Sequence, residues 1–199
     1  MVEWFSSHPW ITGVVTFFLA WSDWLLTVLQ ERERQIHYAE HYQSYPVNTI
    51  EGNPMYQSVV NARRIAEPRH LVPALIVSVI VAFALVWIPQ NFRALLIGYV
   101  WGLYLIVDTT HLGNLLGYRA GRHGLHGKLY LHQRTGYLMQ MGRYLALAMF
   151  LIILAVCSPS LFIAGVAIAG VSSAVRQLVW MRKIPPIDEA DEPPSTLKL

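Results

Sequence analysis

The stretch VDTTHLGN, residues 107–114, places an aspartate, a histidine and an asparagine inside an otherwise apolar segment. Ionisable groups within a bilayer are costly and usually face a protein interior or water. Helix neighbours three residues apart share a face, so we expect Asp108, His111 and Asn114 to form one polar stripe, with Thr110 at its edge. A carboxylate and an imidazole at this spacing can ligate a metal ion or act as an acid–base pair.

Three other apolar segments carry ionisable groups at a similar depth. These groups are Asp23, Arg143 and Arg176, and Thr27 follows Asp23 by about one turn. With the helical rise of 1.5 Å per residue, they fall, like Asp108, roughly 7–12 Å inside the ends of their segments. We expect them to form one layer, in which Thr27, Arg143 and Arg176 contact a ligand.

The long connection between the first two apolar segments contains the turn-rich sequence SYPVNTIEGNP. If this loop folds back under the bundle, Glu51 joins Asp108, His111 and Asp23 as a catalytic group, and Asn53 contacts the ligand. Carboxylate and imidazole ligands suit zinc, iron or manganese. A divalent metal ion held by these four residues is therefore one hypothesis for the site.

The composition indicates what kind of molecule positions these residues. Only 14% of the 199 residues are charged and 54% are hydrophobic, whereas soluble domains carry about 25% charged residues. The single cysteine, Cys157, excludes an intrachain disulfide and a multi-cysteine metal site. Lysine and arginine lie beside apolar segments and form no basic stripe with aromatic residues, so we expect no nucleic-acid partner. The composition is that of a membrane protein.

Five apolar segments are each near the roughly 20 residues needed to cross a hydrocarbon core. They cover about residues 10–29, 71–88, 94–116, 137–156 and 160–180. We predict an all-α membrane protein: a single transmembrane domain over residues 1–183 with about five helices. A disordered Pro-rich acidic tail at 184–199 is expected to follow it. Residues 55–70 predict an amphipathic helix on the cytoplasmic membrane surface.

The distribution of charge predicts the orientation. Lysine and arginine gather in the connections 30–70 and 117–136 and near the C-terminus, while the opposite side has only Arg93. Basic connections face the cytoplasm, which places the N-terminus outside the inner, or cytoplasmic, membrane. We expect the basic loops to contact anionic lipid headgroups. The polar layer then lies near the cytoplasmic face.

Small residues recur at four-residue spacing in the fifth apolar segment. Gly165, Ala169 and Ser173 form one series, and Gly170 and Ala174 form another. Such series allow helices to approach closely. They fit packing inside the chain and equally a homo-oligomer formed through the fifth span.

Several of these residues also form a combination of motifs. Asp23 and Thr27 in the first segment precede the loop motif Glu51-Gly52-Asn53-Pro54, and His111 and Asn114 follow in the third segment. Within residues 20–120 this combination resembles a group of small prokaryotic polytopic membrane proteins that share a Glu-x-Asn-Pro loop motif. The resemblance implies a multi-pass membrane protein. No activity is assigned to the group, so the resemblance implies no mechanism.

Three functions fit these residues. The first is a membrane-embedded enzyme or a lipid- or ligand-binding protein that uses the polar layer and Glu51. The second is a homo-oligomeric channel or transporter, which the apolar outer halves of the segments disfavour. The third is a structural or assembly subunit of a membrane complex, in which Asp23 and Asp108 pair with Arg143 and Arg176 as charge clamps.

Overall fold

A computed structural model of the chain describes residues 1–53, 55–122, 124 and 127–186. Pro54 of the loop motif and residues 187–199 of the predicted tail lie outside this part. Five long helices dominate the structure. They are α2 (Pro9–His37), α4 (Pro68–Trp87), α5 (Gln90–Gly121), α6 (Gln133–Cys157) and α7 (Leu161–Met181). Each is long and apolar enough to cross a membrane, which confirms the prediction of a mostly helical chain with five helices of membrane-spanning length.

The helices begin at residues that favour helix starts. The carboxylate of Glu67 accepts a hydrogen bond from the backbone N–H of Arg69, and Pro68 opens α4. Ser160 caps α7 by accepting from the N–H of Ile163 at 3.4 Å. Helix α2 runs beyond its predicted apolar segment, because polar and charged residues with good helix propensity continue it. Helix α5 also runs beyond its predicted segment, as far as Gly121.

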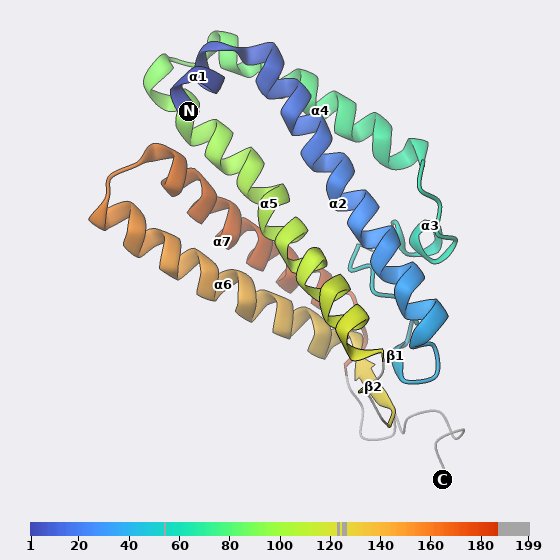
Figure 1. The fold of residues 1–199 in the computed structure, drawn as a ribbon. Helices are drawn as coiled ribbons and strands as arrows, with labels where there is room; N and C mark the ends of the chain where they lie inside the picture. Colours follow the sequence, from blue (N-terminus) through green and yellow to red (C-terminus); the bar gives the residue numbers. More distant parts are fainter. Residues whose placement is uncertain (54, 123, 125–126, 187–199) are drawn as a thin grey trace.

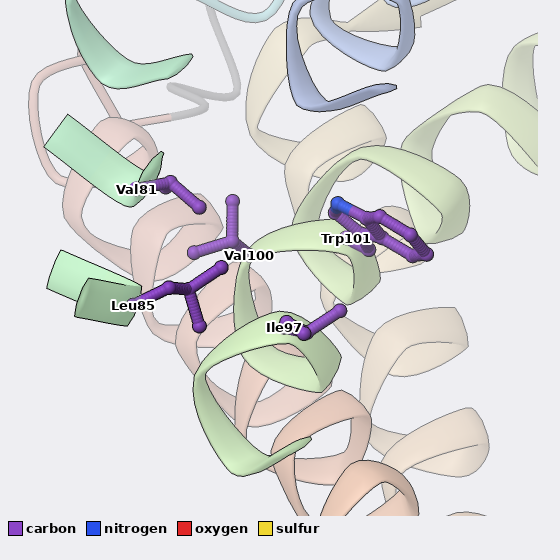
Figure 2. Close-up of a cluster of buried hydrophobic side chains, with 5 residues drawn as sticks. All are labelled: Val81, Leu85, Ile97, Val100 and Trp101. Carbon is purple, nitrogen blue, oxygen red and sulfur yellow. The ribbon is translucent and has the colours of Figure 1, made fainter. Parts of the chain in front are cut away.

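The helices pack as an open arc in the order α4, α2, α5, α7, α6, with α5 in the middle (Figure 1). A buried apolar cluster joins α4 to α5 near the start of α5. Its members are Val81, Leu85, Ile97, Val100 and Trp101, all shown in Figure 2. The indole N–H of Trp101 donates to the hydroxyl of Thr16 at 3.0 Å and so links α5 to α2. This end of the bundle is therefore packed as an apolar core.

Two short strands form at the other end, which we call the strand end. Strand β1 (Tyr42–Tyr45) pairs in parallel with β2 (Leu129–His132). A short helix, α1 (Val2–Ser7), lies at the opposite end, where Arg93 donates to the carbonyl oxygen of Ser6 at 3.1 Å (Figure 1). Neither the strands nor α1 was predicted, because each is too short to show a periodic pattern.

The predicted amphipathic helix at residues 55–70 is wrong in length and in surroundings. The structure has only α3 (Gln57–Asn61), and its Val59 and Val60 are buried against Trp24 and Val28 of α2. These two valines are covered by the protein itself, whereas Met55 and Ile65 of the same stretch stay exposed. The chain leaves the helix at Arg63, whose φ is 56°.

The small residues of α7 pack within the chain. A Cβ added to Gly165 would overlap the carbonyl oxygen of Leu95 on α5, and one added to Gly170 would lie 3.0 Å from the Cβ of Ala148 on α6. Ser173 lies on the same helix and is fully buried. These contacts account for the small-residue series without a second copy of the chain.

Candidate functional site

A cavity of about 630 Å³ lies at the strand end, between the five long helices and the segment 42–56. Its lining contains all the predicted site residues except Asp108 and Thr110. These lining residues are Asp23, Thr27, Glu51, Asn53, His111, Asn114, Arg143 and Arg176. The structure therefore brings together groups that are up to about 150 positions apart in the sequence.

Helix α5 contributes a regular stripe to the cavity. Tyr104, Val107, His111, Asn114 and Tyr118 line it, at alternating spacings of three and four residues. This is the spacing of one helix face. The two tyrosines were missed by sequence reasoning, although the same spacing through His111 and Asn114 would have found them.

Asp108 corrects the prediction of a single polar face. Each step of three residues turns about 60° backwards around a helix, so Asp108 and Asn114 lie about 120° apart. The Oδ2 atom of Asp108 accepts a hydrogen bond from the hydroxyl of Ser22 at 2.5 Å, while Oδ1 is buried with no hydrogen-bond partner. Asp108 thus joins α5 to α2 outside the cavity and meets neither arginine.

Thr110 also lies outside the cavity lining. Its hydroxyl donates to the carbonyl oxygen of Ile106 at 2.9 Å, one turn earlier in the same helix. The bond satisfies the side chain locally. No role in ligand contact follows for Thr110.

His111 is held by contacts on both ring nitrogens. Nδ1 lies 2.9 Å from the amide oxygen of Gln30, and Nε2 lies 3.1 Å from the hydroxyl of Thr27. An amide oxygen only accepts, so the neutral imidazole carries its proton on Nδ1 and leaves Nε2 as the acceptor. Nε2 is also 3.5 Å from a carboxylate oxygen of Asp23. An imidazole and a carboxylate thus lie side by side at the cavity wall.

The loop that carries Glu51 docks onto α6 and α7. The hydroxyl of Tyr137 donates to the carbonyl oxygen of Gly52 at 2.7 Å. A Cβ at Gly52 would stand 3.4 Å from the Trp180 ring, at van der Waals distance, so the loop backbone packs against this ring of α7. The contacts place Glu51 and Asn53 in the cavity wall, as the hypothesis of a folded-back loop predicts.

The carboxyl group of Glu51 has an altered acidity. Burial raises its pKa to about 7, against the lowering effects of the Asn53 N–H, which donates to Oε1 at 2.6 Å, and of the Arg176 charge. Desolvation of the charged form is the larger cause. Glu51 can therefore gain or lose a proton near neutral pH.

A buried ion pair anchors the segment that closes the cavity. Arg34 binds Glu31 through two hydrogen bonds of 3.0 and 2.6 Å, and these residues are 2% and 0% exposed. Arg34 also donates to the side-chain oxygen of Asn48 at 2.7 Å and to the carbonyl of Tyr42. Neither Glu31 nor Arg34 was singled out from the sequence.

The two cavity arginines lack carboxylate partners. Within the described residues, no salt bridge includes Arg143 or Arg176. The guanidinium of Arg176 lies 5.1 Å from the centre of the Trp180 ring, a cation–π arrangement. The predicted charge clamps between these arginines and Asp23 or Asp108 are not formed.

The metal hypothesis finds no support. Across residues 1–53, 55–122, 124 and 127–186, no three histidine, cysteine, aspartate or glutamate side chains gather closely enough to hold an ion. Of the four proposed metal ligands, Asp108 contacts Ser22 outside the cavity, and only Asp23, Glu51 and His111 line it.

The first and last helices of the arc, α4 and α6, both line the cavity. His70, Pro73 and Ala74 of α4 form one wall, and Met139 and Gln140 of α6 form another. Among the described residues, α4 packs extensively on α2 alone and α6 packs extensively on α7. Within the described chain, the first and last helices of the arc are therefore not joined by extensive packing.

Comparison of the chain with known proteins found no matching family, no matching curated protein and no matching solved structure.

Proposed function

We propose that this chain is a multi-pass membrane protein that binds the polar end of a small amphipathic molecule, a lipid or a lipid-like ligand, in its cavity. One observation carries the proposal: the cavity collects ionisable groups from separate elements without neutralising the arginines in ion pairs. Arg143 and Arg176 line it, and in the part of the chain described neither forms a salt bridge. Charge within a membrane domain normally finds a partner, and a bound ligand supplies one.

The shape and walls of the cavity support an amphipathic ligand. Its volume falls within the roughly 300–1,000 Å³ of small-molecule sites. Trp24, Tyr104 and Trp180 add aromatic walls beside the charged groups. The unclosed side of the arc, between α4 and α6, allows an acyl chain to extend into the bilayer while the polar end stays inside.

The apolar core at the α1 end of the bundle favours a ligand-binding protein over a channel that conducts ions or solutes. The apolar cluster around Leu85 and Ile97 fills the space beyond the cavity, and both side chains are fully buried. A conduction path needs polar lining through the whole thickness. A one-sided cavity, open toward the cytoplasm if the basic end faces inward, suits a ligand that arrives from that face or from the bilayer.

Catalysis on the same ligand is a second candidate. The observation that favours it is the contact of Nε2 of His111 with the carboxylate of Asp23, an arrangement that can move a proton. In that case His111→Gln abolishes turnover and leaves ligand binding within about threefold of wild type.

Filling the cavity tests the proposal. Gly136 lines the cavity, and a Cβ there would meet only the side chain of Leu131, at 3.7 Å. Gly136→Phe therefore places a ring in the binding space. Gly142, on the same helix, is exposed, lies outside the lining and has open space around it, so Gly142→Phe is the matched control.

The measurement is native mass spectrometry of purified protein mixed with dioctanoyl phospholipids of several headgroups. We expect wild type and Gly142→Phe to retain one lipid per chain, and Gly136→Phe to lose it. Equal retention by the two phenylalanine variants would show that the lipid binds elsewhere, and the proposal would fail.

A further inference from the structure

We propose that the ligand headgroup is zwitterionic and carries a phosphate together with a primary ammonium group. The inference rests on the proposed function and names its ligand class. Its basis is that the cavity presents both signs of charge from different elements. Asp23 comes from α2 and Glu51 from the loop, while Arg143 comes from α6 and Arg176 from α7.

The acidic groups are arranged to accept an ammonium. Oε1 of Glu51 is occupied by the Asn53 N–H, whereas Oε2 makes no hydrogen bond within the described chain. Asp23 contributes a second carboxylate, one oxygen of which lies 3.5 Å from Nε2 of the neutral His111 imidazole. Tyr56 and Tyr104 line the same cavity. Carboxylate oxygens beside aromatic faces are favourable surroundings for a cation.

The basic groups are arranged to bind a phosphate. A guanidinium presents a planar set of N–H donors that matches the oxygens of phosphate. The guanidinium of Arg176 lies over the Trp180 ring and makes no hydrogen bond within the described chain, so its N–H groups are free to donate. Arg143, from the neighbouring helix, lines the same cavity and makes no hydrogen bond within the described chain. Two such donors can hold one phosphate between α6 and α7.

The balance of charge favours a headgroup with both signs of charge over simpler ligands. A purely anionic headgroup would satisfy the arginines but bring its charge beside Asp23 and Glu51. A purely cationic one would satisfy the carboxylates but face both arginines. Like charges at close range in a region of low dielectric repel strongly. A headgroup with both charges offers an opposite charge to each pair, and a primary ammonium supplies N–H donors that both carboxylates can accept.

The test compares three probes on wild-type protein: dioctanoyl phosphatidylethanolamine, dioctanoyl phosphatidylglycerol and dioctanoyl glycerol. The second lacks the ammonium, and the third lacks both charges. We expect phosphatidylethanolamine to bind about tenfold more tightly than phosphatidylglycerol, as the loss of one charged hydrogen bond implies. The neutral glycerol lipid should bind most weakly. This comparison needs no variant, so misfolding cannot obscure it.

Variants then assign each charge. Asp23→Asn should reduce the preference for phosphatidylethanolamine over phosphatidylglycerol, while Arg176→Gln should weaken both lipids about tenfold. The matched controls are Asp108→Asn, whose carboxylate faces Ser22 outside the cavity, and Arg182→Gln, an exposed arginine just beyond α7. Neither control should change the affinity of either lipid.

The outcomes separate this inference from the proposed function. If phosphatidylglycerol binds as tightly as phosphatidylethanolamine, and Gly136→Phe abolishes both, the cavity binds lipid but the zwitterionic headgroup is wrong. If Gly136→Phe changes the binding of no probe, the proposed function itself fails. Preference for phosphatidylethanolamine that is lost in Asp23→Asn and kept in Asp108→Asn supports both.

Discussion

At the scale of single residues, Glu51 couples the loop to pH. Its pKa of about 7, raised by burial from the ordinary 4.5, means that the folded protein binds this proton more tightly than the unfolded chain does. The free energy of unfolding therefore falls as pH rises from about 4.5 to about 7, by up to about 3 kcal/mol. Glu51→Gln keeps a neutral side chain and should remove this loss.

The measurement is thermal unfolding in detergent from about pH 5 to about pH 8. The stability of Glu51→Gln relative to wild type should increase with pH across this range. Glu40→Gln changes an exposed glutamate near the same end of the bundle and serves as the control. A constant difference between Glu51→Gln and wild type at every pH would contradict the raised pKa.

The buried pair of Arg34 and Glu31 predicts a larger effect. Arg34→Met leaves the carboxylate of Glu31 buried without its cation and releases Asn48. Breaking a buried pair from one side costs about 3–5 kcal/mol. Arg32→Met, an exposed position in the same helix, should cost less than about 0.5 kcal/mol.

A double variant checks the cause. Glu31→Met combined with Arg34→Met removes both charges and should recover part of the stability lost in Arg34→Met, as judged by the unfolding temperature. If the double variant is less stable than the single one by the full cost of a second core substitution, the lost contacts to the loop matter more than the uncompensated charge.

The polar stripe on α5 shows how well residue types and spacing alone predict which side chains line the cavity. They placed His111 and Asn114 on one face, and both line the cavity. They failed for Asp108, because a rotation of about 60° per three residues accumulates across the stripe. Tyr104 and Tyr118 escaped notice because tyrosines in an apolar segment are ordinary core residues until a cavity is known to lie beside them.

At the scale of elements, the contact between α5 and α7 depends on glycine. A Cβ added to Gly98 would overlap the carbonyl oxygen of Phe162, which belongs to the backbone of α7 and cannot rotate away. Gly98→Ala must therefore separate the two helices. We expect it to destabilise the protein by about 1–3 kcal/mol despite the better helix propensity of alanine.

Gly113→Ala is the matched control in the same helix, since nothing lies within 4 Å of its added Cβ. Its unfolding temperature should equal or exceed that of wild type. An equal loss of stability in the two variants would mean that the close approach of α5 and α7 is not the cause.

The long elements were predictable and the short ones were not. Apolar length alone indicated the five helices, whose bounds extend the predicted segments by up to eight residues. Strands β1 and β2 have four residues each, and the chain between them exceeds eighty residues. No local pattern encodes such a pairing, which depends on how the helices bring Tyr42 and Leu129 together.

At the scale of the whole molecule, the odd number of spanning helices predicts termini on opposite sides of the membrane. The strand end carries nearly all the basic residues and Arg93 stands alone at the other, so we expect the strand end to face the cytoplasm. The cavity then opens to the cytoplasmic leaflet. This orientation decides which lipids can reach Arg143 and Arg176.

The single cysteine tests this orientation directly. Cys157 is exposed at the end of α6, at the α1 end of the bundle. A membrane-impermeant maleimide should label it in intact cells whose outer barrier is open to the reagent. In a Cys157→Ala background, Glu40→Cys places the thiol at an exposed position of the strand end and should react only after the membrane is lysed. The opposite result would invert the chain, and the cavity would then take its ligand from the outer leaflet.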